Sequence, residues 1–340
     1  MASGNGLTQA IENEDIGMKR WRQAVPLLLV LFAVSGCKTS DDAKAASEQM
    51  SKTAKDLSAY YATLDEAVTN TDAIEKLQQA IDGTPYSTQD AARLKTLHEE
   101  ISKRAAMAKA MGDLSDAFAK YTGSKAAGDI ADAASNLGTE LVSIKAMPSG
   151  PPIPEALGAA GRAIAELAQT HKEREIAATM TKTLASVEEL FSKEKPLYEQ
   201  VYEESLKPAA IVAREMVERG YADKGPLLET AMQPFGLQAR IAGDVAPQQE
   251  QLTATPDADA CDAKDIPCRM RAFAIAEIKR KEAALVDGQS KASDAMEQAL
   301  AEMTKRMQQL STEKTMGART APPSLDTVEQ WLSYSAKKKN

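Results

Sequence analysis

The sequence predicts an all-α protein: an elongated antiparallel helical bundle with coiled-coil-like long helices. Aromatic residues make up only 4% of the 340 residues, whereas Ala, Glu, Lys, Leu and Met dominate, a composition typical of long helices. Apolar residues recur at spacings of three and four along most of the chain. Runs of alternating Val, Ile, Thr and Tyr, joined by Asn-Gly or Asp-Gly turns, are missing from the sequence.

The first two helices have clear sequence limits. The first is predicted from about 42 to 81, because Met50, Leu57 and Leu64 recur every seven residues. Gly83-Thr84-Pro85 ends it. The second begins after Ser87, a predicted N-cap with Asp90 three residues later. Its apolar stripe runs to Phe118, and Thr122-Gly123-Ser124 is predicted to end the helix.

A proline-rich turn at 147–154 separates two arms rich in Gly and Ala. Small residues let helices approach closely, so we expect the two arms to pack together as a hairpin. From Pro154 the helical pattern continues for about forty residues. Pro196 and Pro208 are expected to kink or divide the helix that follows. We therefore predict one bundle over 37–195 and a second helical region over 196–340.

The C-terminal region is predicted to hold a broken stretch over 220–250, a polar loop over 253–268 and a long helix from about 267 to 316. Spacings of 4, 3, 4 and 3 mark a coiled-coil seam in this helix, formed by Met296, Leu300, Met303, Met307 and Leu310. A last helix at 324–338, capped by Ser324, is expected to dock on the bundle through Trp331.

The N-terminal region has the three parts of a bacterial export signal. Lys19, Arg20 and Arg22 precede an apolar run from 25 to 34, and Val34-Ser35-Gly36-Cys37 follows. This last tetrapeptide resembles the lipobox of bacterial lipoproteins. The resemblance implies a signal peptide over 18–36, cleavage before Cys37 and acylation of that cysteine. Residues 1–17 then read as a mis-assigned extension upstream of Met18.

The resemblance also suggests a location. Lys38 is not the aspartate that retains such proteins at the inner membrane of enteric bacteria. The resemblance, with Lys38 at this position, therefore implies a cell-envelope protein. The covalent lipid on Cys37 would hold it in the outer membrane, facing the periplasm. Several acyl chains on one cysteine anchor a protein stably. We expect no other cofactor.

The net charge disfavours one class of partner, and the cysteine content predicts a disulfide. The net charge of −8 disfavours nucleic acid, which requires clustered Lys and Arg. With Cys37 assigned to the lipid, Cys261 and Cys268 remain. An oxidising envelope predicts a structural disulfide between them, although a redox-active pair is an alternative.

Motifs for catalysis are missing from the sequence. His98 and His171 do not form His-Glu-x-x-His, and neither Gly-x-Ser-x-Gly nor a Walker-type loop occurs. We therefore predict no metal site and no enzyme, with an unrecognised enzyme as a residual alternative. The candidate interaction surface consists of Tyr198 and Tyr202, one helical turn apart, together with Met296, Met303 and Met307.

Three functions remain open. The first is a non-enzymatic scaffold or adaptor that binds another envelope protein through helical seams. The second is a carrier or binding protein whose methionines line an apolar groove. The third is a membrane-active protein whose Gly/Ala-rich hairpin at 124–168 inserts into lipid.

Overall fold

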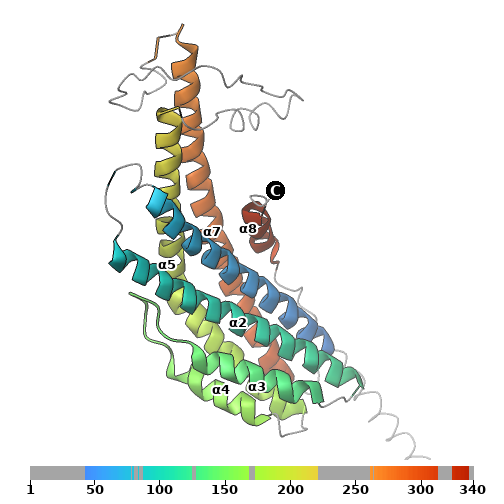
Figure 1. Cartoon of the computed structure of the whole chain (residues 1–340). Helices are drawn as coiled ribbons and strands as arrows, with labels where there is room; N and C mark the ends of the chain where they lie inside the picture. The colour runs from blue at the N-terminus through green and yellow to red at the C-terminus, as the bar shows by residue number, and fades with distance from the viewer. Residues whose placement is uncertain are drawn as a thin grey trace, which may run out of the picture.

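The computed structural model describes residues 43–77, 79, 83, 87–124, 128–167, 173–220, 261–262, 264–312 and 324–336. Every regular element in these ranges is an α-helix (Figure 1), so the prediction of an all-α bundle is confirmed. The helices are the N-terminal helix (residues 43–77), α2 (Thr88–Ser124), α3 (Gly128–Ser143), α4 (Glu155–Leu167), α5 (Glu173–Glu218), α7 (Ile266–Thr312) and α8 (Asp326–Ala336).

Neighbouring long helices run antiparallel. The N-terminal helix pairs with α2 through the hydrogen bond from Ser58 Oγ to the Ala105 carbonyl, 3.0 Å long. At its start, Gln49 is hydrogen-bonded to Arg306 near the end of α7. α5 and α7 lie side by side along much of their length (Figure 1). The start of α2 follows the predicted cap, since Ser87 Oγ accepts the Asp90 amide at 3.3 Å.

The hairpin of α3 and α4 covers the bundle at one end. Its turn is closed by the Gly150 amide, which donates to the Met147 carbonyl at 2.9 Å. The predicted close approach of the two Gly/Ala-rich helices, α3 and α4, occurs at Gly161. A Cβ there would lie 3.1 Å from the Gly138 carbonyl and 3.2 Å from the Leu141 Cβ. The small residues therefore serve helix packing between α3 and α4.

The helical pattern that continues for about forty residues from Pro154 is divided between two helices. The chain forms two helices here, α4 and α5, and they pack against each other. Because α4 and α5 pack side by side and only residues 168–172 separate them in sequence, the two helices run in opposite directions. The spacing of apolar residues continues on both sides of the reversal, so periodicity alone did not reveal it.

Both prolines lie inside α5, which continues past Pro196 and Pro208 to Glu218. Proline inside a helix costs about 3 kcal/mol. The long contact of α5 with α7 outweighs that cost. The predicted division near residue 195 falls within α5 and stays a prediction.

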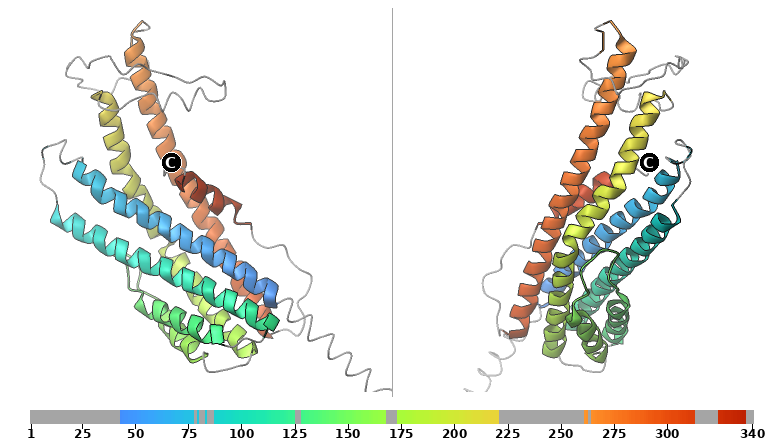
Figure 2. Two further views of the ribbon diagram at one scale, coloured as in Figure 1. Left: turned by 45° about the vertical axis from the view of Figure 1, so that its right-hand side comes forward. Right: turned by 90° about the vertical axis from the view of Figure 1, so that its left-hand side faces the viewer.

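Most of the buried apolar residues form one large core, and a few others form one small cluster. The large core takes side chains from all seven helices, but from α7 only from Leu285 onward. The small cluster consists of Val217 on α5 with Ala274 and Ile275 on α7, and Ile278 packs beside it. We call these two helix ends, residues 207–220 and 266–284, the arm. The arm extends beyond the other helices in every view (Figure 2).

The methionine seam of α7 lies within the large core. Met296, Leu300, Met303 and Met307 are all buried there. This seam therefore joins helices of the same chain. Its coiled-coil character stays a prediction.

Candidate functional site

The prediction that five residues form an interaction surface is wrong, because none of them lies at the surface of the described chain. Tyr198, Tyr202, Met296, Met303 and Met307 are all buried, with exposed fractions from 0% to 4%. The helical stripe that made them candidates is the stripe by which α5 and α7 contact the bundle. The carrier hypothesis loses its proposed groove, since the three methionines fill the core.

The centre of the bundle holds an ion pair that the sequence did not reveal. The Arg104 side chain of α2 and the Glu194 side chain of α5 are both fully buried. Arg104 Nε donates to Glu194 Oε2 at 2.7 Å, and its Nη2 donates to Oε1 at 2.5 Å. The hydroxyl of Tyr198 donates to the same carboxylate at 2.5 Å.

The remaining Arg104 donors are also used. Nη1 donates to the Glu100 carbonyl at 2.8 Å, and Nη2 donates to the Lys145 carbonyl at 3.0 Å. Burial alone would lower the pKa of Arg104, but the hydrogen bonds and charge of Glu194 raise it above its ordinary value. The guanidinium is therefore permanently charged and fixed between three segments of the chain. It joins α2, α5 and the turn after α3.

A second buried polar group lies between the N-terminal helix and α7. The hydroxyls of Tyr60 and Ser293 are 2.7 Å apart, and Gln289 Nε2 donates to the Tyr60 oxygen at 2.9 Å. Nearby, the hydroxyls of Tyr61 and Tyr198 are 3.2 Å apart. Burial raises the pKa of all three phenols, so they stay protonated near neutral pH.

This buried network has no catalytic geometry. Its tyrosines cannot act as bases near neutral pH, and the Arg104–Glu194 pair is held by neighbouring groups inside the core. Among the described helices, its role is to fix which helix faces which. A buried network of this kind arises from residues far apart in sequence, so no local motif predicts it.

His98 is the one described histidine and lies between the N-terminal helix and α2. Its Nδ1 donates to Asp65 Oδ1 at 2.6 Å, and Ser102 Oγ donates to the other oxygen of the same carboxylate at 3.0 Å. In a catalytic triad the serine is bonded to the histidine. Here the serine is bonded to the aspartate and not to the histidine, so the arrangement is not that of a triad. His171 lies outside the described residues.

Helix α8 docks through Trp331, as the sequence predicted. Its indole is 4% exposed and lies with its ring centroid 5.2 Å from Tyr60 and 5.5 Å from Tyr202. Glu329 on the same helix forms a salt bridge of 2.8 Å with Lys52. Beside this pair, burial and the Glu329 carboxylate raise the pKa of Asp56, an effect that Lys52 partly offsets.

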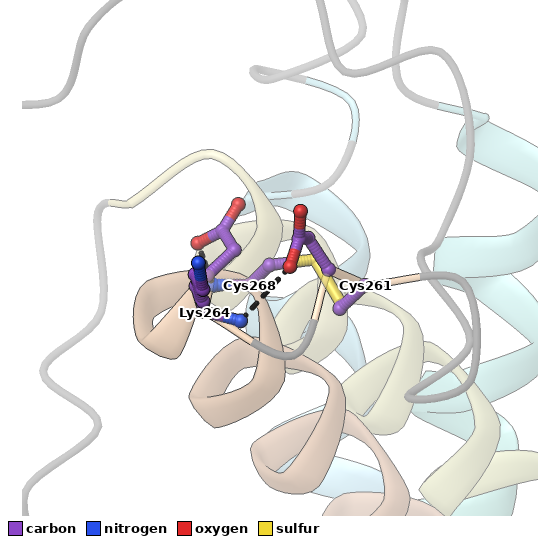
Figure 3. The surroundings of a disulfide bond; sticks show 5 residues. Cys261, Lys264 and Cys268 are labelled. Carbon is purple, nitrogen blue, oxygen red and sulfur yellow. Dashed lines mark hydrogen bonds between the residues drawn. A yellow bond between two sulfur atoms is a disulfide. The ribbon is translucent and has the colours of Figure 1, made fainter.

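Cys261 and Cys268 are joined by a disulfide at the start of α7 (Figure 3). The cysteine count predicted this bond. Asp265 caps the helix, since its Oδ1 accepts the Cys268 amide at 3.0 Å. The neighbouring carboxylate of Asp262 accepts the Lys264 amide at 3.0 Å. Asp262 and Asp265 lie between the two cysteines in sequence, and negative charge there disfavours a thiolate, which supports a structural disulfide over a redox-active one.

Several predicted features fall outside the residues that the structure describes. The signal peptide, the extension at 1–17, Cys37 and most of the loop at 253–268 lie outside the described residues. Within the described helices, none is both long and apolar enough to cross a bilayer. The same residues contain no group of three His, Cys, Asp or Glu side chains arranged to hold a metal ion.

No protein family, no curated protein and no solved structure compared with this chain matches it.

Proposed function

We propose that this chain is a lipid-anchored, non-enzymatic adaptor of the bacterial cell envelope. Acylated Cys37 would hold it in the outer membrane, and the helical bundle would carry a binding surface into the periplasm. The observation that carries the proposal is the sequence Val34-Ser35-Gly36-Cys37 after a basic and apolar segment.

The position of the anchor supports a role in presenting a surface. Cys37 lies six residues before position 43, where the N-terminal helix begins, and such a stretch spans at most about 20 Å. Gln49 of this helix is bonded to Arg306, and Ile266 lies 40 residues before Arg306 on α7. At about 1.5 Å per residue, the free end of the arm lies roughly 60 Å from the anchored end.

The chemistry of the described residues supports a non-enzymatic role. The buried ionisable groups at the centre of the bundle are bonded to one another, and Ser102 is bonded to Asp65 rather than to His98. The disulfide of Cys261 and Cys268 suits an oxidising compartment. The membrane-active alternative is less well supported, because Leu157 of the hairpin is fully buried in the core.

The anchor is tested on protein purified from the membrane of a bacterium that expresses the full chain. Mass spectrometry of the mature N-terminus is expected to find Cys37 as the first residue, carrying acyl chains. A Cys37→Ser variant should remain unprocessed and unacylated. An unmodified Cys37 in the wild-type chain would contradict the proposal.

The adaptor role is tested separately by cross-linking in intact cells. The matched control is a Cys37→Ser chain exported by a cleavable secretory signal, which keeps the bundle and loses the lipid. We expect one envelope protein to be cross-linked to the anchored form and much less of it to the released form. Recovery of lipid or glycan without any protein partner would contradict an adaptor.

A further inference from the structure

One face of α7 in the arm carries an exposed row with the spacing of a coiled-coil seam. Its members follow one another at intervals of 3, 4, 3, 4 and 3 and are all exposed. They are Ile266, Arg269, Phe273, Ala276, Arg280 and Ala283. We call them the outer row. On an α-helix, residues with this spacing lie along one face.

The opposite face of α7 in the arm is buried within the chain. Ala274 and Ile275 are buried against α5, and Ala272 is buried as well. The large core reaches α7 only from Leu285. The outer row therefore lies on the part of α7 that the bundle does not cover (Figure 2).

The outer row combines large apolar side chains with cations. Ile266 is 64% exposed and Phe273 is 42% exposed. Arg269 lies between them in the row. Arg280 lies two helical turns after Phe273 and also binds Glu277. From Arg269 to Glu282, α7 carries five cationic and two anionic side chains, although the whole chain has a net charge of −8.

We propose that the outer row binds an acidic amphipathic helix of a partner protein. The apolar side of that helix would contact Ile266, Phe273 and the alanines, and its carboxylates would lie against Arg269 and Arg280. The spacing fits a helix lying along α7, and the charge requires an acidic one. This inference rests on the adaptor role proposed above and names the class of partner.

A second copy of the chain fits the outer row poorly. Two copies anchored in one membrane through Cys37 would present their arms in the same direction. A symmetric pair would then run α7 parallel and place Arg269 against Arg269 and Arg280 against Arg280. Facing like charges destabilise such a contact.

A bilayer surface is also a poorer fit. A helix that lies on a membrane keeps its cations on a polar face, apart from its apolar face. In the outer row, Arg269 lies between Ile266 and Phe273 on the same face. Alternation of this kind is the pattern of a seam between helices.

The test uses two designed helical peptides, each about 21 residues or three heptads long. Both carry the same leucines on the face toward α7. One carries glutamates and the other lysines opposite Arg269 and Arg280. Binding to the full mature chain, with its disulfide intact, is measured by fluorescence anisotropy at low and high salt. We expect the acidic peptide to bind about tenfold more tightly, a difference of about 1.4 kcal/mol, and to weaken with salt.

Three variants make the test specific. Arg269→Glu/Arg280→Glu should reverse the preference toward the lysine peptide, and Phe273→Asp should weaken binding of both peptides about tenfold. The matched control, Lys279→Glu/Lys305→Glu, makes the same charge change at exposed positions outside the row and should change binding less than about threefold. Circular dichroism confirms that each variant is folded.

Several outcomes would overturn the inference. They are equal binding of both peptides, unchanged preference in Arg269→Glu/Arg280→Glu, and tighter binding to vesicles of anionic phospholipid than to the acidic peptide. Dimerisation that is lost in Phe273→Asp would assign the row to a second copy. A photo-reactive residue at position 276 that cross-links to its own chain would show an occupant from within the molecule. None of these results depends on acylation of Cys37, so the anchor and the outer row are tested independently.

Discussion

The bundle core and the arm share the helices α5 and α7 but are stabilised in different ways. In the core, α5 places Phe191 and Tyr198 against Tyr60 and Tyr61 of the N-terminal helix, with ring centroids 5.5 to 6.3 Å apart. Aromatic pairs of this kind add to the energy of apolar burial. The buried Arg104–Glu194 pair lies beside them.

In the arm, the buried cluster among the described residues joins these same two helices. Their buried apolar side chains are Val217, Ala274 and Ile275, with Ile278 beside them, together with Ala210, Val212 and Ala272. These side chains are fewer and mostly smaller than those of the bundle core. The disulfide of Cys261 and Cys268 fixes the start of α7. The arm is therefore expected to open locally at a lower free energy than the core.

This difference separates two tasks within one pair of helices. The core residues of α5 and α7 specify the fold and are inaccessible to a partner. The arm residues contribute less to stability and leave one face of α7 exposed. Variants in the two regions should thus have different effects, and four substitutions test this from the largest expected effect to the smallest.

The largest loss is expected for Arg104→Ala in the core. It leaves the buried carboxylate of Glu194 without its cation, which typically costs about 3–5 kcal/mol of the free energy of unfolding. Urea unfolding followed by circular dichroism measures it. The double variant Arg104→Met/Glu194→Leu should recover most of the loss, because it removes both charges. A loss below about 1 kcal/mol for Arg104→Ala would mean that the pair does not hold the core together.

Trp331→Ala should release α8 from the core. Truncating a buried Trp costs about 3–5 kcal/mol, and an isolated helix of 11 residues is not stable in water. Hydrogen exchange should therefore become fast over 326–336 and change little in α2. Gln330→Ala, at an exposed position on the same helix, is the control. Unchanged hydrogen exchange in α8 would show that the contacts of Trp331 with Tyr60 and Tyr202 do not hold α8 on the core.

Removing the disulfide should affect the arm alone. For a loop with a sequence separation of 7, Cys261→Ser/Cys268→Ser is expected to cost about 2 kcal/mol. Faster hydrogen exchange should be confined to the first turns of α7 and the end of α5. The same change in the reduced wild-type protein would tie the effect to the bond. A lower urea midpoint for the whole bundle would contradict the division between core and arm.

The smallest effect is expected for Asp56→Asn beside α8. Burial and Glu329 raise the pKa of Asp56 above its ordinary 3.8, so the folded chain binds this proton more tightly than the unfolded chain. The free energy of unfolding therefore falls as pH rises from 3.8 through the raised pKa. Asn removes this fall and should stabilise the protein near neutral pH by less than about 1 kcal/mol. Thermal unfolding at several pH values measures it, and a lower stability of Asp56→Asn near pH 7 would contradict the assignment.

Local signals in the sequence predicted the features that depend on neighbouring residues. The cap at Ser87, the turn at 147–154, the close approach at Gly161 and the seam from Met296 to Met307 all follow from spacing and residue type. Docking of α8 through Trp331 also follows, since a short helix with one apolar face requires a surface to bury it.

Features that depend on partners far along the chain were missed or misassigned. Tyr198 and Tyr202 were predicted at a surface because a stripe on a helix does not say whether its partner lies in the same chain. The reversal between α4 and α5 and the helical state of Pro196 and Pro208 depend on packing that spacing cannot reveal. The Arg104–Glu194 pair joins residues 90 positions apart.

The sequence by itself determined that this protein is helical, where most of its helices begin and end, and which two cysteines pair. It also supplied the resemblance to a lipoprotein signal. Only the tertiary structure decided which apolar faces meet inside the chain and which face of α7 stays exposed. The physical reason is that helix formation depends on residues three and four positions apart, whereas burial depends on which helices the whole chain brings together.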